Sequence, residues 1–179
     1  MITLVVVALV VAGVVAWLFT GYGAPVLREA TLGAREQALV AAVADAFFPP
    51  GGPIPLSGTQ AGLVRYFDGY VGRSEPFPRF MLRLLLVYAE LEPLIFGPRH
   101  VRFTRLTQDE RLAALESAGL SSIYFRRVTF ISMRAVMTMG YLANAEVAKA
   151  MRMTSEADPF GLGDRVVEDE YPVSPEAHP

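Results

Sequence analysis

Side chains that could do chemistry are sparse in this chain. It contains no cysteine, which excludes thiol nucleophiles, disulfides and thiolate-bound zinc or iron–sulfur sites. His100 and His178 are its two histidines and lie far apart in the sequence, so neither a metal site nor an imidazole base is indicated. The glycine-rich stretches 49–55 and 161–163 lack the preceding strand of a phosphate-binding loop. We therefore predict no catalytic or metal-ligating residue, and no cofactor bound by this chain alone.

Arginines supply candidate contacts with other molecules. Arg126, Arg127 and Arg134 fall within a sector of ~100° on a predicted helix, where they either bind a substrate carboxylate or pair with acids on neighbouring helices or a partner. Arg99 and Arg102 belong to a basic connector, which is either a solvated loop or a contact with anionic lipid or an acidic partner. We take all five arginines as partner-contact candidates. The formal net charge of −2 gives no footprint for nucleic acid.

The strongest structural signal lies at the start of the chain. Residues 2–20 contain no charged side chain and are long enough, as a helix, to cross a hydrocarbon core of ~30 Å. Trp17 and Tyr22 lie near its carboxyl end, where aromatic rings favour the lipid headgroup level. We interpret residues 1–25 as a transmembrane anchor. A cleaved signal peptide, which needs a preceding basic segment, and a buried core helix are the alternatives.

The body of the protein, residues 26–153, has the periodicity of a helical bundle. Helices are predicted over 31–48, 57–72, 78–91, 107–118, 121–143 and 144–151. Their proposed N-caps are Thr31, Ser57, Thr107, Ser121 or Ser122, and Asn144.

The predicted helix 78–91 is the most apolar of the set. Its charged residues Arg79, Arg83 and Glu90 lie within ~40° of one another around the helix, and Pro93 is expected to end or kink it. This pattern indicates either a central position in the bundle or a helix partly buried by another protein.

Residues 154–179 form a third region, rich in proline, glycine and acidic side chains. We expect an extended acidic tail that is either disordered or ordered along a partner. Phe160 and Tyr171 are its candidate partner contacts. The predicted fold class is therefore all-α: a single N-terminal transmembrane helix, a small helical bundle and an extended acidic C-terminal tail.

A series of short motifs runs through the bundle. They are ADAFFP at 44–49, PLSGTQAG at 55–62, FTRLTQDER at 103–111, YFRR at 124–127 and MGYL at 139–142. Their order resembles the gluconate 2-dehydrogenase subunit 3-like family over residues 31–151. It is most similar to those relatives that accompany, or are fused to, flavin-dependent glucose–methanol–choline oxidoreductases.

The resemblance implies a helical accessory subunit that aids the folding, export or docking of a large partner. FAD and the catalytic base would belong to that partner, so no catalytic residue is carried over. Members of the family often begin with a twin-arginine export signal, whereas no arginine precedes Arg28 here. This departure favours permanent anchoring, and we expect a single-pass protein of the bacterial inner membrane. Arg28 and Arg35 after the span favour a cytoplasmic body.

Three functions remain open from the sequence. The first is a noncatalytic, membrane-anchored accessory or scaffold subunit of a flavin-dependent oxidoreductase, with a large membrane-associated protein and membrane lipid as partners. The second is an accessory subunit of a respiratory or photosynthetic membrane complex. The third is a small lipid-handling enzyme with Arg83, Glu90 or Tyr88 in polar roles between the long helices.

Overall fold

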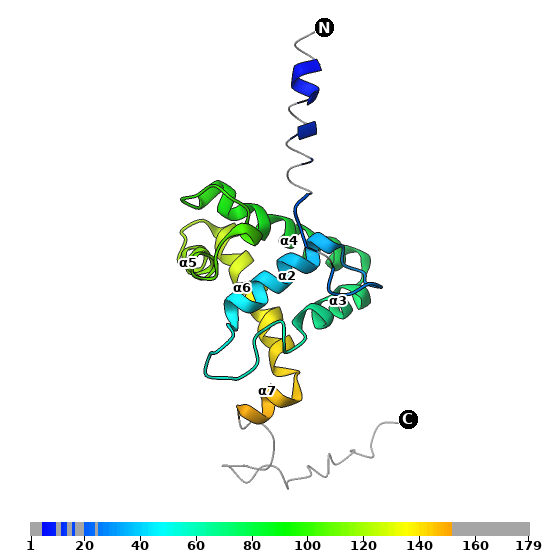
Figure 1. Cartoon of the computed structure of the whole chain (residues 1–179), viewed down its shortest axis with the longest axis vertical. Helices are drawn as coiled ribbons and strands as arrows, with labels where there is room; N and C mark the ends of the chain where they lie inside the picture. Colours follow the sequence, from blue (N-terminus) through cyan, green and yellow to red (C-terminus); the bar gives the residue numbers. More distant parts are fainter. Residues whose placement is uncertain (1–4, 10–11, 14–15, 17–19, 24, 152–179) are drawn as a thin grey trace, which may run out of the picture.

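Helices form all the regular structure in the described part of the chain. The computed structural model describes residues 5–9, 12–13, 16, 20–23 and 25–151, and among these no residue lies in a strand. The elements are α2 (Ala34–Phe47), α3 (Leu63–Arg73), α4 (Pro76–Phe96), a 3₁₀ turn η1 (Phe103–Arg105), α5 (Gln108–Gly119), α6 (Tyr124–Leu142) and α7 (Ala145–Ala150). The predicted all-α bundle is confirmed (Figure 1).

The central helix of the bundle is α2. It packs against α3, α4, η1, α5 and α6. Its inward residues Leu39, Val40 and Val43 are at most 2% exposed, and they pack into the same apolar core as Phe67 of α3 and Met133 of α6. Alanines such as Ala42, Ala44 and Ala46 are buried too. Small side chains on a helix allow several neighbours to approach it closely, which explains its central place.

The predicted N-cap residues are confirmed at two helices. Thr107 caps α5, since its hydroxyl accepts from the backbone N–H of Glu110 and the Glu110 carboxylate accepts from the backbone N–H of Thr107. Asn144 caps α7 by accepting from the N–H groups of Glu146 and Val147.

The other proposed caps were wrong. Gly33 rather than Thr31 precedes α2, and its N–H donates to the Glu36 carboxylate at 2.8 Å. Ser57 is 3% exposed and belongs to a turn, and α3 begins only after Gly62, whose φ of 84° is left-handed. These deviations shorten the predicted helices 31–48 and 57–72 at their starts. At α6 the N-cap residue is Ile123 rather than either serine.

Of the two alternatives predicted for the third helix, a central position in the bundle is excluded by its exposed side chains. α4 runs from Pro76 to Phe96, with Pro93 inside it, and its buried residues cluster in its second half. Phe77, Phe80 and Leu84 are 72%, 59% and 51% exposed. α4 therefore covers one side of the core, and its first half projects apolar side chains outward.

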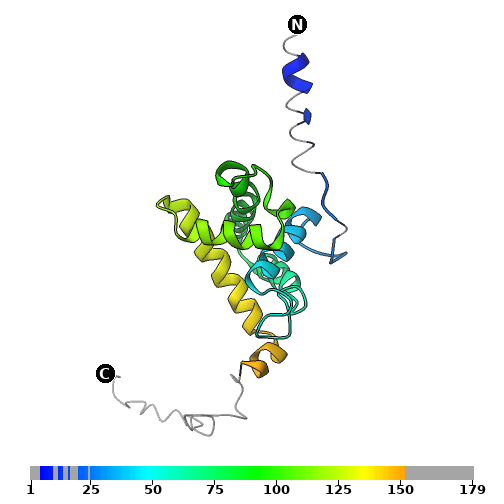
Figure 2. The same cartoon turned by 60° about the vertical axis from the view of Figure 1, so that its left-hand side comes forward.

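The N-terminal segment leaves the body at the end opposite α7, as Figures 1 and 2 show. Residues 5–9 and 12–13 are helical and exposed. In the described residues, no helix combines the length and the apolar content needed to cross a bilayer. Part of the predicted span, Trp17 included, and the predicted tail with Phe160 and Tyr171 lie outside the described residues.

Candidate functional site

The polar stripe of α4 is bonded to neighbouring segments of the protein, although the Arg83 side chain remains 43% exposed. Arg79 donates to three carbonyls at the carboxyl end of α3. Arg83 donates to the Thr31 carbonyl at 2.7 Å, and its Nε lies 3.7 Å from the Glu36 carboxylate. Glu90, on the same stripe, is 2% exposed. The charged side chains of this helix therefore all contact neighbouring backbone or side chains, although Arg83 Nε itself has no hydrogen bond among the described residues.

The opposite side of α4 is apolar and open. Phe77, Phe80, Met81 and Leu84 are all exposed. At about 100° per residue they fall within an arc of ~100° that lies across the helix from the charged stripe. A surface helix ordinarily keeps its apolar side chains on the buried face. α4 buries apolar residues such as Leu86 and Ala89 and, in addition, exposes this second apolar face.

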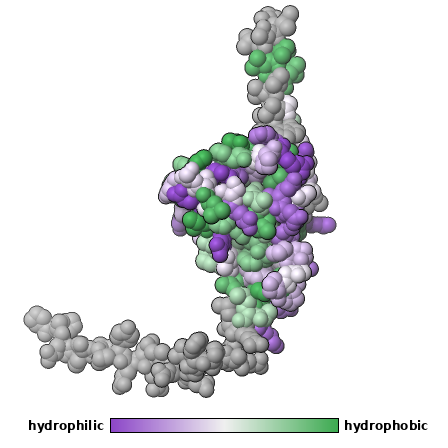
Figure 3. Space-filling model, turned by 90° about the vertical axis from the view of Figure 1, so that its left-hand side faces the viewer, coloured by the Kyte–Doolittle hydropathy of each residue, from purple (hydrophilic) through white to green (hydrophobic). Residues whose placement is uncertain are grey.

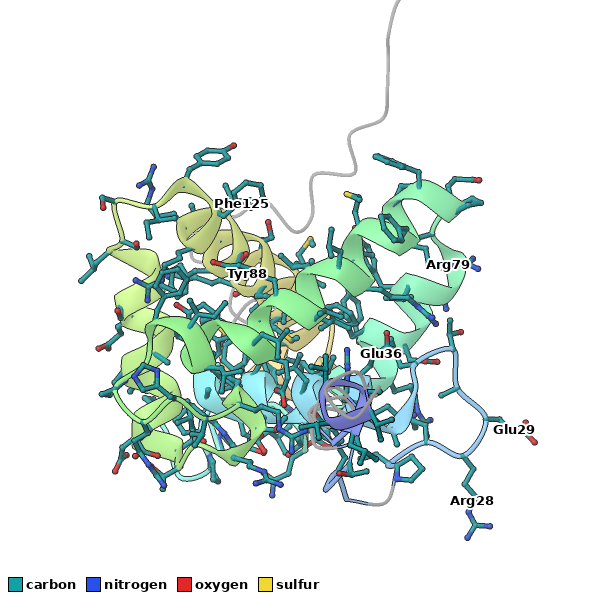
Figure 4. All side chains as sticks on the ribbon, turned by 90° about the horizontal axis from the view of Figure 1, so that it is seen from above. Arg28, Glu29, Glu36, Arg79, Tyr88 and Phe125 are labelled. Carbon is teal, nitrogen blue, oxygen red and sulfur yellow. The ribbon has the colours of Figure 1, made fainter. Side chains whose placement is uncertain are left out.

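A groove of about 530 Å³ runs between this face and α6. Figure 4 shows α4 and α6 diverging on its two sides, with Tyr88 on α4 and Phe125 at the start of α6. Among the residues that the structure describes, no charged side chain lines it. Its lining residues are Tyr70, Pro78, Met81, Leu82, Leu84, Leu85, Tyr88, Phe125, Val128, Thr129 and Ser132.

Four of the lining residues, Tyr70, Tyr88, Thr129 and Ser132, carry a hydroxyl group. In the described residues, the Tyr88 phenol has no hydrogen-bond partner, although the side chain is half-buried. Its pKa is raised, first by burial and then by the Glu92 carboxylate, while Arg126 acts in the opposite sense. Tyr88 therefore stays protonated and is able to donate a hydrogen bond into the groove.

On the face of the body seen in Figure 3, hydrophobic patches alternate with hydrophilic ones. Tyr124 and Phe125 are 66% and 70% exposed, and their rings meet edge to face at 6.2 Å. These aromatic side chains extend the open apolar surface beyond the groove itself.

A second feature, the Arg102 network, joins the N-terminal segment to the body. The Glu90 carboxylate accepts hydrogen bonds from the Tyr22 hydroxyl at 2.9 Å and the Thr104 hydroxyl at 2.7 Å. Arg102 donates to the Tyr22 hydroxyl at 2.9 Å and to the Thr20 carbonyl at 3.0 Å. Its guanidinium also lies 4.7 Å from the centre of the Tyr22 ring.

The charges of the Arg102 network are buried together. Arg102 Nε lies 4.0 Å from a Glu90 oxygen, and the two side chains are 0% and 2% exposed. Buried charges persist only when they are paired and hydrogen-bonded, and this network supplies both conditions. Burial, followed by the hydrogen bond to Glu90, raises the pKa of Tyr22. The network therefore fixes Thr20 and Tyr22 against α4 and the η1 region.

These contacts give two predicted site residues environments other than the predicted ones. Arg102, a partner-contact candidate, is fully buried and is not exposed to a partner. Tyr22, a candidate for the lipid headgroup level, directs its hydroxyl into the body at Glu90. The sequence offered one signal for this network: Glu90 is an acid on a helix whose other face is apolar.

The remaining arginine candidates have different environments. Arg126 forms a bond of 2.6 Å with Glu92, largely buried on both sides, so the prediction of pairing with a neighbouring helix is confirmed for this residue. Arg127 donates to the carbonyls of Ser121 and Ser122. Arg99 pairs with Glu110 at 2.9 Å on the surface, and Arg134 is exposed.

The polar residues proposed for a lipid-handling enzyme do not meet at one site. Tyr88 lines the groove, whereas Arg83 contacts Thr31 and Glu90 belongs to the Arg102 network. Within the described ranges, no three His, Asp or Glu side chains are placed to hold a metal ion.

Sequence reasoning missed the groove, although its signal was present. The predicted helix 78–91 carried more apolar side chains than one buried face requires.

Comparison with protein-family models, curated proteins and solved structures gives no match for this chain. The resemblance to the gluconate 2-dehydrogenase subunit 3-like family therefore stays a prediction.

Proposed function

We propose that this protein is a noncatalytic accessory subunit that is held at a membrane by its apolar N-terminal segment and docks a partner protein on the α4–α6 face. The observation that carries the proposal is the orientation of α4, whose charged stripe is bonded inward while Phe77, Phe80 and Leu84 point outward. Contiguous exposed apolar surface on a soluble body marks an interaction site.

The Arg102 network supports the same function. A subunit that presents a docking face beside a membrane needs a defined connection between its anchor and its body. The hydrogen bonds from Arg102 to Thr20 and Tyr22 supply such a connection at the carboxyl end of the apolar stretch 2–20.

The proposed partner is a large flavin-dependent oxidoreductase, as the family resemblance implies, with FAD bound in that partner. The alternative is a respiratory or photosynthetic membrane complex, which the same docking face would serve. In both cases the body is proposed to lie on the cytoplasmic side of a bacterial inner membrane, because Arg28 and Arg35 follow the span.

Affinity purification of the full chain from detergent-solubilised membranes tests the proposal. We expect a larger protein to copurify with the wild type and with the control Leu120→Glu, which changes an exposed leucine outside the groove. Leu84→Glu should reduce copurification at least tenfold, because it places a charge in the groove lining. The absorbance of the complex distinguishes flavin from haem or pigment. A chain that purifies alone under these conditions would contradict the proposal.

A further inference from the structure

We infer that the α4–α6 groove binds a single uncharged helix of the partner protein. The inference rests on the proposed function and specifies which structural element of the partner is recognised.

The lining residues recur at helical spacing on both walls. On α4 they are Pro78, Met81, Leu82, Leu84, Leu85 and Tyr88, and on α6 they are Phe125, Val128, Thr129 and Ser132. Positions three and four residues apart form the ridges between which another helix packs its own side chains. The groove therefore has the walls of a bundle from which one helix is missing, which is the geometry of helix-in-groove recognition.

The length of the groove fits a short stretch of helix. From Pro78 to Tyr88 the α4 wall rises about 15 Å at 1.5 Å per residue, close to three helical turns. A partner helix would fill this length with about three apolar side chains at spacings of three and four residues.

The charge of the groove selects the chemistry of that helix. Because the lining residues that the structure describes are all uncharged, an acidic or basic side chain placed against them would lose hydration without gaining a counter-ion from them. The Tyr88 phenol, which has no partner in the described residues, is able to donate to a hydroxyl, amide or carbonyl oxygen of the incoming helix. The expected face is thus apolar with one hydrogen-bond acceptor.

Phe80 and Phe125 are the expected anchors of the contact. They lie on α4 and α6 respectively and are 59% and 70% exposed. Large aromatic side chains beside a groove contribute most strongly to binding because each buries a large apolar area at low cost in conformational entropy.

Photocrosslinking in native membranes tests the inference. A benzophenone amino acid replaces Phe80 in one full-length variant and Phe125 in another, and Leu120 serves as the matched exposed control. We expect both aromatic positions, one beside the groove and one lining it, and not the control, to crosslink to the same apolar helical segment of another polypeptide, as mapped by mass spectrometry. Tyr88→Phe should weaken association about fivefold without changing the melting temperature, which corresponds to the loss of one hydrogen bond.

Three outcomes would overturn the inference. They are crosslinks to a second copy of this chain, crosslinks to lipid, and equal crosslinking from Leu120. If a partner copurifies but Leu84→Glu leaves its association unchanged, the groove is not the contact, although an accessory function through another surface survives. If no partner copurifies with any variant, the inference and the proposed function both fail.

Discussion

Glu90 shows how one acidic residue determines the local architecture. Its carboxylate accepts from the hydroxyls of Tyr22 and Thr104 and from the Thr104 backbone N–H, and it lies beside Arg102. Each of these contacts offsets part of the cost of removing a carboxylate from water. Because the partners come from distant parts of the chain, the stability of the charge and the position of the N-terminal segment depend on each other.

Removal of one member of the buried pair should be costly. Arg102→Met leaves the Glu90 carboxylate without its counter-ion, and we expect the free energy of unfolding to fall by about 3–5 kcal/mol. The double variant Glu90→Leu with Arg102→Met removes both charges and should recover most of that loss. Urea unfolding followed by far-ultraviolet circular dichroism measures the free energy of unfolding of the single and the double variant. Additive losses in the double variant would show that the two charges are not coupled.

Tyr22 should make the stability depend on alkaline pH. Burial and Glu90 raise its pKa above the ordinary value of 10.0, so the folded protein retains the phenolic proton at pH values where the unfolded chain releases it. The contribution of Tyr22 to the free energy of unfolding is therefore complete below about pH 10. It is lost as the pH rises through the pKa that Tyr22 has in the folded protein. Tyr22→Phe should flatten the decline between about pH 9 and 11 in urea titrations.

Other tyrosines provide the comparison for that experiment. Burial also raises the pKa of Tyr141, so the wild-type decline has more than one source. The prediction concerns the difference between the wild type and Tyr22→Phe. Parallel pH profiles for the two proteins would contradict it.

At the scale of elements, a close approach of two backbones limits the turn before α3. The N–H of Gly58 donates to the Phe48 carbonyl at 2.9 Å, and a Cβ at position 58 would overlap the backbone carbonyl of Ala44 in α2. We expect Gly58→Ala to lower the free energy of unfolding by about 2–3 kcal/mol, since backbone atoms cannot move aside as a flexible side chain can. Gly23→Ala, where a Cβ meets nothing within 4 Å, is the matched control. Equal denaturation midpoints for both variants would contradict this packing.

The α5 capping box allows a smaller test. Thr107→Ala removes the hydroxyl that accepts from the Glu110 N–H, and about 1 kcal/mol of stability should be lost. Differential scanning calorimetry should detect a lower melting temperature. Thr138→Ala, an interior change on α6, should have a smaller effect.

Helices were predictable from the sequence where their signals are local. The capping box of Thr107 and the Asn144 cap act within three residues, so their patterns specify them directly. Ser57 does exchange the two bonds of a capping box with Gln60, but the turn that it opens ends at Gly62, whose left-handed φ of 84° separates it from α3.

The orientation of α4 and the Arg102 network depend on tertiary contacts, and periodicity alone could not give them. A helix apolar on most sides can be buried or can lie on the surface with one face open, and the neighbouring helices decide which. Tyr22 and Arg102 are separated by 80 positions, and no pattern in either local sequence indicates the other. The sequence did predict that Glu90 shares a stripe with Arg79 and Arg83, but not that this stripe is bonded to neighbouring segments of the protein.

At the scale of the whole molecule, the Arg102 network and the groove have complementary roles. The network holds the exit of the N-terminal segment against the body, and the groove lies between two helices of that same body. α4 takes part in both, since Glu90 belongs to the network and Tyr88 lines the groove. A rigid connection through α4 would therefore fix the direction in which the groove opens relative to the N-terminal segment.

This connection predicts a measurable restriction of motion. The chain has no cysteine, so Ala16 and Glu116, both exposed, can be converted to cysteines and spin-labelled without further changes. We expect a narrow distribution of distances between the two labels when pulsed electron paramagnetic resonance is recorded in lipid nanodiscs. Tyr22→Ala should at least double the width of that distribution, because it removes the group that bonds to both Glu90 and Arg102. Gly23→Ala leaves those bonds intact and should keep the distribution narrow. An unchanged width in Tyr22→Ala would show that other contacts fix the N-terminal segment relative to the body. The Arg102 network would then stabilise the fold without orienting the docking groove.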